Sequence, residues 1–293
     1  MSKLIYRGYN QAALDAQYNN QRSVPATDYP ALMKRYSDET ALAKQTSHCL
    51  EDLRYGPHPD QLLDLYLPQA TEAPIQVFIH GGAWRQLGKN DSGFAASAFT
   101  QARSLFAALH FSASPAVTLD TMVRQVREAI AWLWRHAQCY GGDPTRIFVS
   151  GHSSGSHLLS QCLVADWPGE FGCPADVIKG ATFVSGLGDL EPVRLSYRNE
   201  GLKLDEHAVQ RLSLMRQTAT VRCPLIAAYA ELDTDEFRRQ TSEVAGYWER
   251  CGFPTQLLEL KARNHFDGAF ELANPAAPLF RACATQMGLL VSP

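Results

Sequence analysis

The sequence Arg146-Ile-Phe-Val-Ser-Gly-His-Ser-Ser-Gly-Ser-His157 joins an apolar run to a segment that is compatible with a helix. Between the two lies Gly151-His-Ser-Ser-Gly155, which fits the pattern Gly-x-Ser-x-Gly. Between a strand and a helix, this pattern is typical of the nucleophile elbow of serine hydrolases. Its glycines occupy positions where a side chain would clash with neighbouring backbone. The stretch therefore predicts Ser153 as a nucleophile, and an ordinary glycine-rich turn is the competing interpretation.

A second glycine-rich segment, His80-Gly-Gly-Ala-Trp84, begins at the last residue of a predicted strand over residues 74–80. Acyl transfer places negative charge on the carbonyl oxygen of the substrate, and preorganised backbone N–H groups stabilise that charge. In serine hydrolases with such an elbow, the turn after the third strand of the sheet and the residue after the nucleophile supply those N–H groups. The residues expected to form such an oxyanion hole are Gly82, Ala83 and Ser154.

The general base is expected to be a histidine late in the chain, because serine hydrolases with such an elbow carry the nucleophile, the acid and the base in that order along the sequence. Of nine histidines, His265 follows the last predicted strand and would lie at the same sheet edge as Ser153. A hydrogen bond between the two would let His265 accept the serine proton and return it to the leaving group. The flanking His152 and His157 are interpreted as structural. Surface positions are expected for His48, His58, His136 and His207.

The acid that orients the base is expected in a loop after the penultimate strand. The segment Leu225-Ile-Ala-Ala-Tyr-Ala-Glu-Leu-Asp-Thr-Asp-Glu-Phe237 offers four carboxylates there. Asp233 is predicted because it stands a few residues beyond the strand end. Asp235 and Glu236 read as solvated carboxylates at the start of a helix. The alternative acid is Asp189, which follows the preceding strand.

Apolar runs separated by turn residues predict strands along the whole chain. They are expected over 61–67, 74–80, 105–111, 147–149, 181–184, 225–229 and 256–260, the first as an antiparallel edge strand. Apolar residues at spacings of three and four predict a helix within 118–140, and a last helix is expected over 276–290. Strands that alternate with helices favour an α/β fold with a mostly parallel central sheet and helices on both faces.

We expect residues 1–293 to form a single domain, since a chain of this length can bury one large core. Residues 1–50 are predicted to be a helical segment near the mouth of the active site, with Asp28 as an N-cap and Pro30 in the first turn. The segment over residues of about 190–222 is long enough only for a small cap-like insertion.

The composition excludes several classes of function. A net charge of −3 and a pI near 6.3 indicate no nucleic-acid partner. No apolar segment reaches the length of a signal-peptide core or a membrane span, which predicts a cytoplasmic protein without membrane association. The seven cysteines are scattered without a Cys-x-x-Cys, as expected for reduced thiols rather than disulfides or a zinc site. No metal and no other cofactor is expected.

With these residues in view, the chain resembles the α/β-hydrolase superfamily and, within it, the arylformamidase (kynurenine formamidase)-like group of esterases and lipases. The resemblance implies a serine mechanism without a metal, in which Ser153 forms an acyl-enzyme that a water activated by His265 then hydrolyses. The motifs that carry it are Tyr55-Gly56, Leu63-Asp-Leu-Tyr-Leu-Pro68, His80-Gly-Gly-Ala-Trp84, Gly141-Gly-Asp-Pro144, Gly151-His-Ser-Ser-Gly-Ser-His157, Ser185-Gly-Leu-Gly-Asp-Leu190, Asp233-Thr-Asp-Glu-Phe237 with Gln240, and His265-Phe-Asp267.

The chain departs from that resemblance at two positions. Many arylformamidases carry a tyrosine where this chain has Ala83 and an aromatic residue where it has Gly188, which predicts a larger or more open cavity. Trp84 and Phe266 would be apolar walls suited to an aromatic substrate, and simple packing is the alternative for both. The residues predicted to line the substrate pocket are His80, Gly81, Trp84, His152, Gly188 and Phe266.

Two reactions fit these residues. One is hydrolysis of a small N-formyl or N-acyl aryl amide, and the other is hydrolysis of small or aryl esters by a carboxylesterase. They share the machinery and differ in the leaving group, because an amide nitrogen must be protonated as it departs. An inactive hydrolase fold used for binding is the third alternative, although no triad member is missing. The expected partner is a small amide or ester, aromatic in the first case, and a homodimer is left open.

Overall fold

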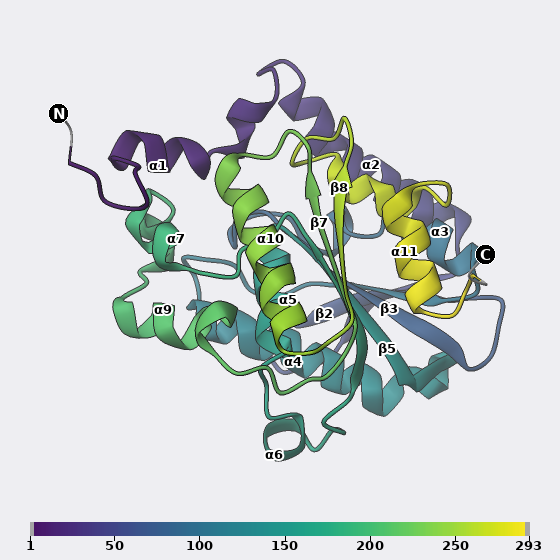
Figure 1. The fold of residues 1–293 in the computed structure, drawn as a ribbon. Coiled ribbons are helices and arrows are strands. Elements are labelled where there is room, and N and C mark those ends of the chain that lie inside the picture. The colour runs from purple at the N-terminus through teal and green to yellow at the C-terminus, as the bar shows by residue number, and fades with distance from the viewer. Residues whose placement is uncertain (1–2, 291–293) are drawn as a thin grey trace.

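The structure is a computed structural model that describes residues 3–290. Its centre is an eight-stranded sheet in the order β1-β2-β4-β3-β5-β6-β7-β8, and β2 runs antiparallel to both of its neighbours while the remaining pairs are parallel (Figure 1). The strands are β1 (Cys49–Arg54), β2 (Leu62–Tyr66), β3 (Ala73–Ile79), β4 (Leu105–Leu109), β5 (Gly142–His152), β6 (Ile178–Val184), β7 (Leu225–Ala230) and β8 (Thr255–Leu260). The predicted fold class, an α/β fold with a mostly parallel sheet, is confirmed.

Helices cover both faces of the sheet. α4, α5 and α10 pack on one face, and α2, α3 and α11 pack on the other (Figure 1). The α-helices are α1 (Gln11–Gln17), α2 (Tyr29–Thr46), α3 (Ala96–Gln101), α4 (Leu119–His136), α5 (Ser154–Cys162), α6 (Trp167–Phe171), α7 (Glu191–Leu195), α8 (Asn199–Leu202), α9 (Glu206–Leu212), α10 (Asp235–Arg250) and α11 (Pro278–Gln286). The 3-10 turns are η1 (Asn20–Ser23), η2 (Lys89–Asp91), η3 (Ala137–Tyr140), η4 (Leu214–Arg216) and η5 (Gly268–Ala273).

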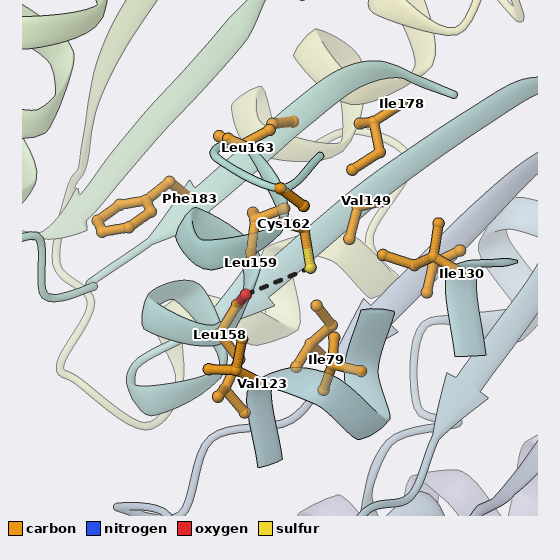
Figure 2. Packing of buried hydrophobic residues seen from close by; sticks show 14 of the residues in the cluster. Ile79, Val123, Ile130, Val149, Leu158, Leu159, Cys162, Leu163, Ile178 and Phe183 are labelled. Atoms are coloured by element: carbon orange, nitrogen blue, oxygen red, sulfur yellow. Dashed lines mark hydrogen bonds between the residues drawn. The ribbon is translucent and has the colours of Figure 1, made fainter. Parts of the chain in front are cut away.

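The buried strands read as continuous apolar runs because both faces of the sheet are covered. Along β4, for example, Leu105 and Ala107 face one core and Phe106 faces the other. Figure 2 shows the first of these cores, where Cys162 at the end of α5 packs among aliphatic side chains. Its thiol donates to the carbonyl of Leu158 at 3.4 Å, and burial raises the pKa of Cys162 to about 12. This thiol is therefore a packing group.

The structure corrects two sequence-based expectations at the start of the sheet. Strand β2 is internal, because β1 pairs with it on one side and β4 on the other. The edge strand β1 was missed, since three of its six residues are charged and none of its side chains is fully buried, so it lacks the apolar run of the inner strands. At α2, Pro30 occupies the first turn as predicted, but the Asp28 side chain makes no capping hydrogen bond because Asp28 is itself helical in backbone conformation.

Two segments lie outside the central layers. Residues 190–222 form the short helices α7, α8 and α9 with η4. Six residues at η1 and on α2 line the cavity described below, namely Asn19, Asn20, Gln21, Tyr29, Met33 and Tyr36. No helix within residues 3–290 has both the length and the apolar character needed to cross a membrane.

Candidate active site

Ser153 occupies a sharp turn between the end of β5 and the start of α5. Its backbone has φ 55° and ψ −121°, a conformation that residues other than glycine rarely adopt. The turn is fixed by a 2.9 Å hydrogen bond from the N–H of Ser153 to the carbonyl of Val184 on β6. Strain of this kind persists only where the surrounding structure enforces it, and such positions concentrate at functional sites.

The glycines on either side of Ser153 are required by close backbone contacts. A Cβ atom on Gly155 would lie 2.1 Å from the carbonyl oxygen of Ile79, at the end of β3. A Cβ atom on Gly151 would lie 2.5 Å from the carbonyl oxygen of Gly155. Both distances are below any normal contact between a carbon and an oxygen atom. The elbow therefore packs against β3 at a separation that only glycine permits.

Gly155→Ala is expected to destabilise the protein strongly, because the added methyl group must push β3 away from α5. Overpacking of this kind costs roughly 1–3 kcal/mol, and a contact with rigid backbone belongs at the upper end. Urea denaturation measures the free energy of unfolding. The matched control is Gly246→Ala in α10, where the added Cβ would meet only the flexible end of Arg250 at 3.2 Å and should raise helix stability. Equal midpoints for native protein and Gly155→Ala would contradict the packing described here.

Three loops at the carboxyl edge of the sheet bring Ser153, Asp233 and His265 together. The Nε2 atom of His265 lies 2.9 Å from the Ser153 hydroxyl oxygen, and its Nδ1 atom lies 2.6 Å from Asp233 Oδ1. Asp233 follows β7 and His265 follows β8, which are neighbouring strands. All three residues are buried: Ser153 is 8% exposed, Asp233 is 5% exposed and His265 is 3% exposed. The arrangement is a continuous hydrogen-bonded line from carboxylate to imidazole to hydroxyl.

The Asp233 carboxylate is held in its ionised form. Burial opposes ionisation, but the neighbouring His265 and hydrogen bonds from Ser185 Oγ at 2.6 Å and from the Ala230 N–H at 2.9 Å hold the pKa of Asp233 below its usual value. An ionised carboxylate accepts a hydrogen bond and cannot donate one. His265 therefore presents its Nδ1–H to Asp233, which leaves Nε2 free to accept the proton of Ser153.

His152, one residue before Ser153, anchors the loop that carries His265. Its Nε2 atom lies 2.8 Å from the main-chain oxygen of His265, and the two rings lie 5.1 Å apart. Burial, and then the proximity of His265, lower the pKa of His152 to about 3. The ring is therefore neutral and donates Nε2–H to that carbonyl. The sequence indicated a structural residue here but gave no sign of this link.

The predicted oxyanion-hole residues lie beside Ser153. Gly82 and Ala83 line the same cavity as Ser153 and have φ angles of 93° and 56°. The Ser154 hydroxyl accepts a 3.1 Å hydrogen bond from the N–H of Trp84, which ties the turn after β3 to the elbow. Within residues 3–290, the N–H groups of Gly82, Ala83 and Ser154 have no hydrogen-bond acceptor. These three donors are available to a ligand.

A cavity of about 310 Å³ opens above Ser153. Of the residues predicted to line the pocket, His152 and Phe266 do so, together with Gly82 and Ala83. The other residues around it are Asn19, Asn20, Gln21, Tyr29, Met33, Tyr36, Arg85, Gln86, Leu87, Ser153, Tyr197, Arg198 and His265. The amino-terminal segment and the 190–222 insertion thus contribute directly to the wall.

The structure corrects the pocket prediction at four positions, none of which lines this cavity. Trp84 is 2% exposed and its indole N–H points to His157 Nδ1 at 3.3 Å, so it packs internally. His80 is buried and stacks on Phe111 with ring centres 4.2 Å apart. Gly81 lies against the main chain of His152. A Cβ atom on Gly188 would lie 2.3 Å from a methyl group of Val244, so this position faces the core.

The alternative acid and the second flanking histidine have structural environments. Asp189 forms an ion pair with Arg216 at 3.1 Å, away from His265. His157 Nε2 lies 2.8 Å from the carbonyl oxygen of Leu212, and burial lowers the pKa of His157 to about 4. The four histidines expected at the surface, His48, His58, His136 and His207, are exposed.

Helix α2 closes the cavity on the side of the His265 loop. The Tyr36 hydroxyl donates to the carbonyl of Phe266, and the Tyr29 ring contacts the Phe266 ring at 5.1 Å edge to face. These contacts hold the residue next to His265 in place. Sequence reasoning placed this segment near the mouth but identified none of its contacting residues, because no local motif marks a contact between residues more than 200 positions apart.

Known proteins that are similar in sequence to this chain include formamidases and esterases. The BD-FAE family model matches residues 63–165, which include the turn after β3 and the elbow. A kynurenine formamidase from Danio rerio is 29% identical over 272 residues, which cover 89% of this chain and 91% of the relative. An isoprenylcysteine alpha-carbonyl methylesterase from Arabidopsis thaliana is 31% identical over 38% of this chain and 26% of the relative.

Two solved structures share the architecture. Esterase B from Lactobacillus rhamnosis superposes with a TM-score of 0.71 at 18% identity, and covers 95% of this chain and 96% of its own. A thermostable carboxylesterase from a metagenomic library superposes with a TM-score of 0.67 at 16% identity. The match covers 90% of this chain and 98% of the carboxylesterase chain. The fold is that of the α/β hydrolases. The similarity to kynurenine formamidases over most of the chain, together with the shared fold, supports a hydrolase of small amide or ester substrates.

Proposed function

We propose that this enzyme hydrolyses a small N-formyl or N-acyl aryl amide through an acyl-enzyme on Ser153. The observation that carries the proposal is the hydrogen-bonded line from Asp233 through His265 to Ser153, which ends in a cavity beside three unpaired N–H groups. The similarity to kynurenine formamidases over most of the chain supports the choice of an aryl formamide.

In the first half of the reaction, Ser153 Oγ attacks the carbonyl carbon of the substrate while His265 Nε2 accepts the hydroxyl proton. The oxyanion that forms would accept hydrogen bonds from Gly82, Ala83 and Ser154, each worth roughly 3 kcal/mol in the transition state. The tetrahedral intermediate collapses as the C–N bond breaks and His265 gives its proton to the departing nitrogen. The products are a free arylamine and an acyl group esterified to Ser153.

In the second half, a water molecule attacks the ester carbonyl and passes a proton to His265. The new tetrahedral intermediate breaks its bond to Ser153 Oγ, which takes that proton back and releases the carboxylic acid. Asp233 stays ionised throughout and stabilises the imidazolium that forms in each half. The overall reaction consumes one amide and one water and returns the enzyme unchanged.

The cavity wall supports an aromatic leaving group. Phe266, Tyr29 and Tyr197 present rings to the cavity, and Met33 adds a flexible thioether. Ala83 also lines the cavity, so its small side chain leaves space where many arylformamidases carry a tyrosine. Gly188 faces the core instead, so the second departure from the family pattern does not enlarge this cavity.

A carboxylesterase is the second candidate, because relatives that match 38% and 40% of the chain include a methylesterase and the esterase LipQ. Steady-state turnover of N-formylkynurenine beside p-nitrophenyl acetate and butyrate separates the two. We expect saturable release of formate and arylamine, with a larger kcat/KM for the formamide than for either ester. A phenylphosphonate that stops this turnover should be found on Ser153 by mass spectrometry. Ester turnover without formamide turnover would assign the enzyme as a carboxylesterase.

A further inference from the structure

Two arginines line the cavity above Ser153 without a carboxylate beside them. Arg85 lies in the loop after β3, and Arg198 lies between α7 and α8. The described residues that surround the cavity include no aspartate or glutamate. Several other arginines of the described chain do pair with carboxylates, as in Arg239 with Glu236 at 2.7 Å and Arg194 with Glu191 at 2.7 Å. The cavity is therefore a positively charged pocket.

Arg198 is fixed in place by the amino-terminal segment. Its Nε donates to the carbonyl of Tyr18 at 2.8 Å, and its Nη2 donates to the same oxygen. Among residues 3–290, no carboxylate forms an ion pair with it, and its Nη1 has no acceptor. Burial, with a further contribution from the positive charge of Arg85, lowers the pKa of Arg198. A guanidinium remains protonated in proteins, so a half-buried cation with free N–H donors faces the cavity.

Arg85 completes the pair from the opposite loop. Its side chain is exposed, and within the described chain it forms no hydrogen bond and no ion pair. Its Cδ and Nε atoms would lie 3.7 Å from a Cβ on Gly201, which places the side chain against α8. Arg85 and Arg198 thus approach each other, which costs free energy unless an anion lies between or beside them.

A buried acceptor lies at the same end of the cavity. Asn20 is 4% exposed, lines the cavity, and its Oδ1 has no hydrogen-bond donor within residues 3–290. It is two residues from Tyr18, whose carbonyl binds Arg198. An unpaired buried oxygen is costly, and a ligand N–H or O–H group would satisfy it. This end of the cavity is therefore suited to a polar part of the ligand.

We propose, given the proposed function, that Arg85 and Arg198 form a subsite for an anionic group on the leaving portion of the substrate. A carboxylate is the anion that fits, because its two oxygens can accept paired N–H groups of a guanidinium. A formyl group has only hydrogen on its carbonyl carbon and cannot bear a carboxylate, so in an aryl formamide the carboxylate belongs to the aryl-amine portion. The enzyme would then select acidic aryl formamides over neutral ones, with Asn20 accepting a hydrogen bond from a donor near the carboxylate.

The test compares 3-(2-formamidobenzoyl)propanoate with its carboxamide, which differs only in the charged group. We expect kcat/KM for the anionic compound to exceed that for the carboxamide by about tenfold or more, as for a charge-assisted hydrogen bond. Arg198→Gln should lower this ratio about tenfold, and the exposed Arg85→Gln should lower it by about threefold. Added salt should lower the ratio in the native enzyme. Arg250→Gln, at an exposed site on α10, changes the net charge equally and should keep the native ratio.

The proposal would be overturned if the ratio of the two kcat/KM values were the same in the native enzyme, in Arg85→Gln and in Arg250→Gln. It would also be overturned if the native enzyme preferred the carboxamide. Arg198→Gln could also lower kcat/KM for both compounds in the same proportion while Arg85→Gln leaves their ratio unchanged. That result would show that Arg198 only holds the carbonyl of Tyr18. Calorimetry on Ser153→Ala with 3-benzoylpropanoate and 3-benzoylpropanamide gives a readout without turnover. Tighter binding of the anion, lost in Arg85→Gln, would support the subsite even if no formamide were hydrolysed, in which case only the proposed reaction would fail.

Discussion

Ser153→Ala is expected to lower kcat for the formamide by on the order of 10⁴-fold or more. The Ser153 hydroxyl is the group within 2.9 Å of His265 Nε2, and alanine leaves no atom that can form the acyl-enzyme. The loss should appear in kcat for amide and ester substrates alike, since both pass through the same intermediate. Steady-state rates with each substrate, and the disappearance of phosphonate labelling, measure it.

The matched control for this variant is Ser160→Ala on the same helix. Its hydroxyl donates to the carbonyl of His157 at 2.7 Å and accepts from Gln161 Nε2 at 3.4 Å, so its removal changes two local hydrogen bonds and leaves the cavity intact. We expect Ser160→Ala to keep kcat within about twofold and Ser153→Ala to unfold at the native denaturant concentration. Turnover that survived in Ser153→Ala would show that a different nucleophile, or none, carries the reaction.

The central sheet and the elbow were predictable because their signals are local. Gly151 and Gly155 flank Ser153 in sequence, and the same three residues build the turn. His265 and Asp233 were also predictable, since each follows a strand and parallel strands deliver their carboxyl ends to one edge. Their meeting follows from strand order rather than from any residue preference.

The cavity wall was less predictable because its residues come from distant segments. Arg198 is held by Tyr18, and Phe266 is held by Tyr36, through hydrogen bonds to main-chain oxygens. A main-chain acceptor leaves no trace in the sequence, since any residue supplies one. Trp84 was misplaced for a related reason. An aromatic residue beside a functional turn has the same sequence pattern whether it faces the cavity or, as here, the core.

Asp233→Asn is expected to lower kcat by roughly 10³- to 10⁴-fold while changing the structure little. The asparagine amide can donate to His265 Nδ1, which would place the imidazole proton on Nε2. That tautomer presents a donor to the Ser153 hydroxyl and cannot accept its proton. Ionised Asp233 is held by hydrogen bonds from Ser185 and Ala230, so the geometry should survive the change while the charge that stabilises the imidazolium is lost.

The control is Asp189→Asn, the carboxylate that the sequence offered as the alternative acid. Its ion pair with Arg216 is partly exposed, and pairs of that kind contribute about 0–1 kcal/mol. We therefore expect Asp189→Asn to keep kcat within about threefold of the native value under the same assay conditions. If both variants lost activity equally, or if Asp233→Asn stayed within tenfold of native enzyme, the hydrogen bond at 2.6 Å would be a packing contact. A large loss confined to Asp233→Asn would instead show that the buried negative charge orients His265 for both proton transfers.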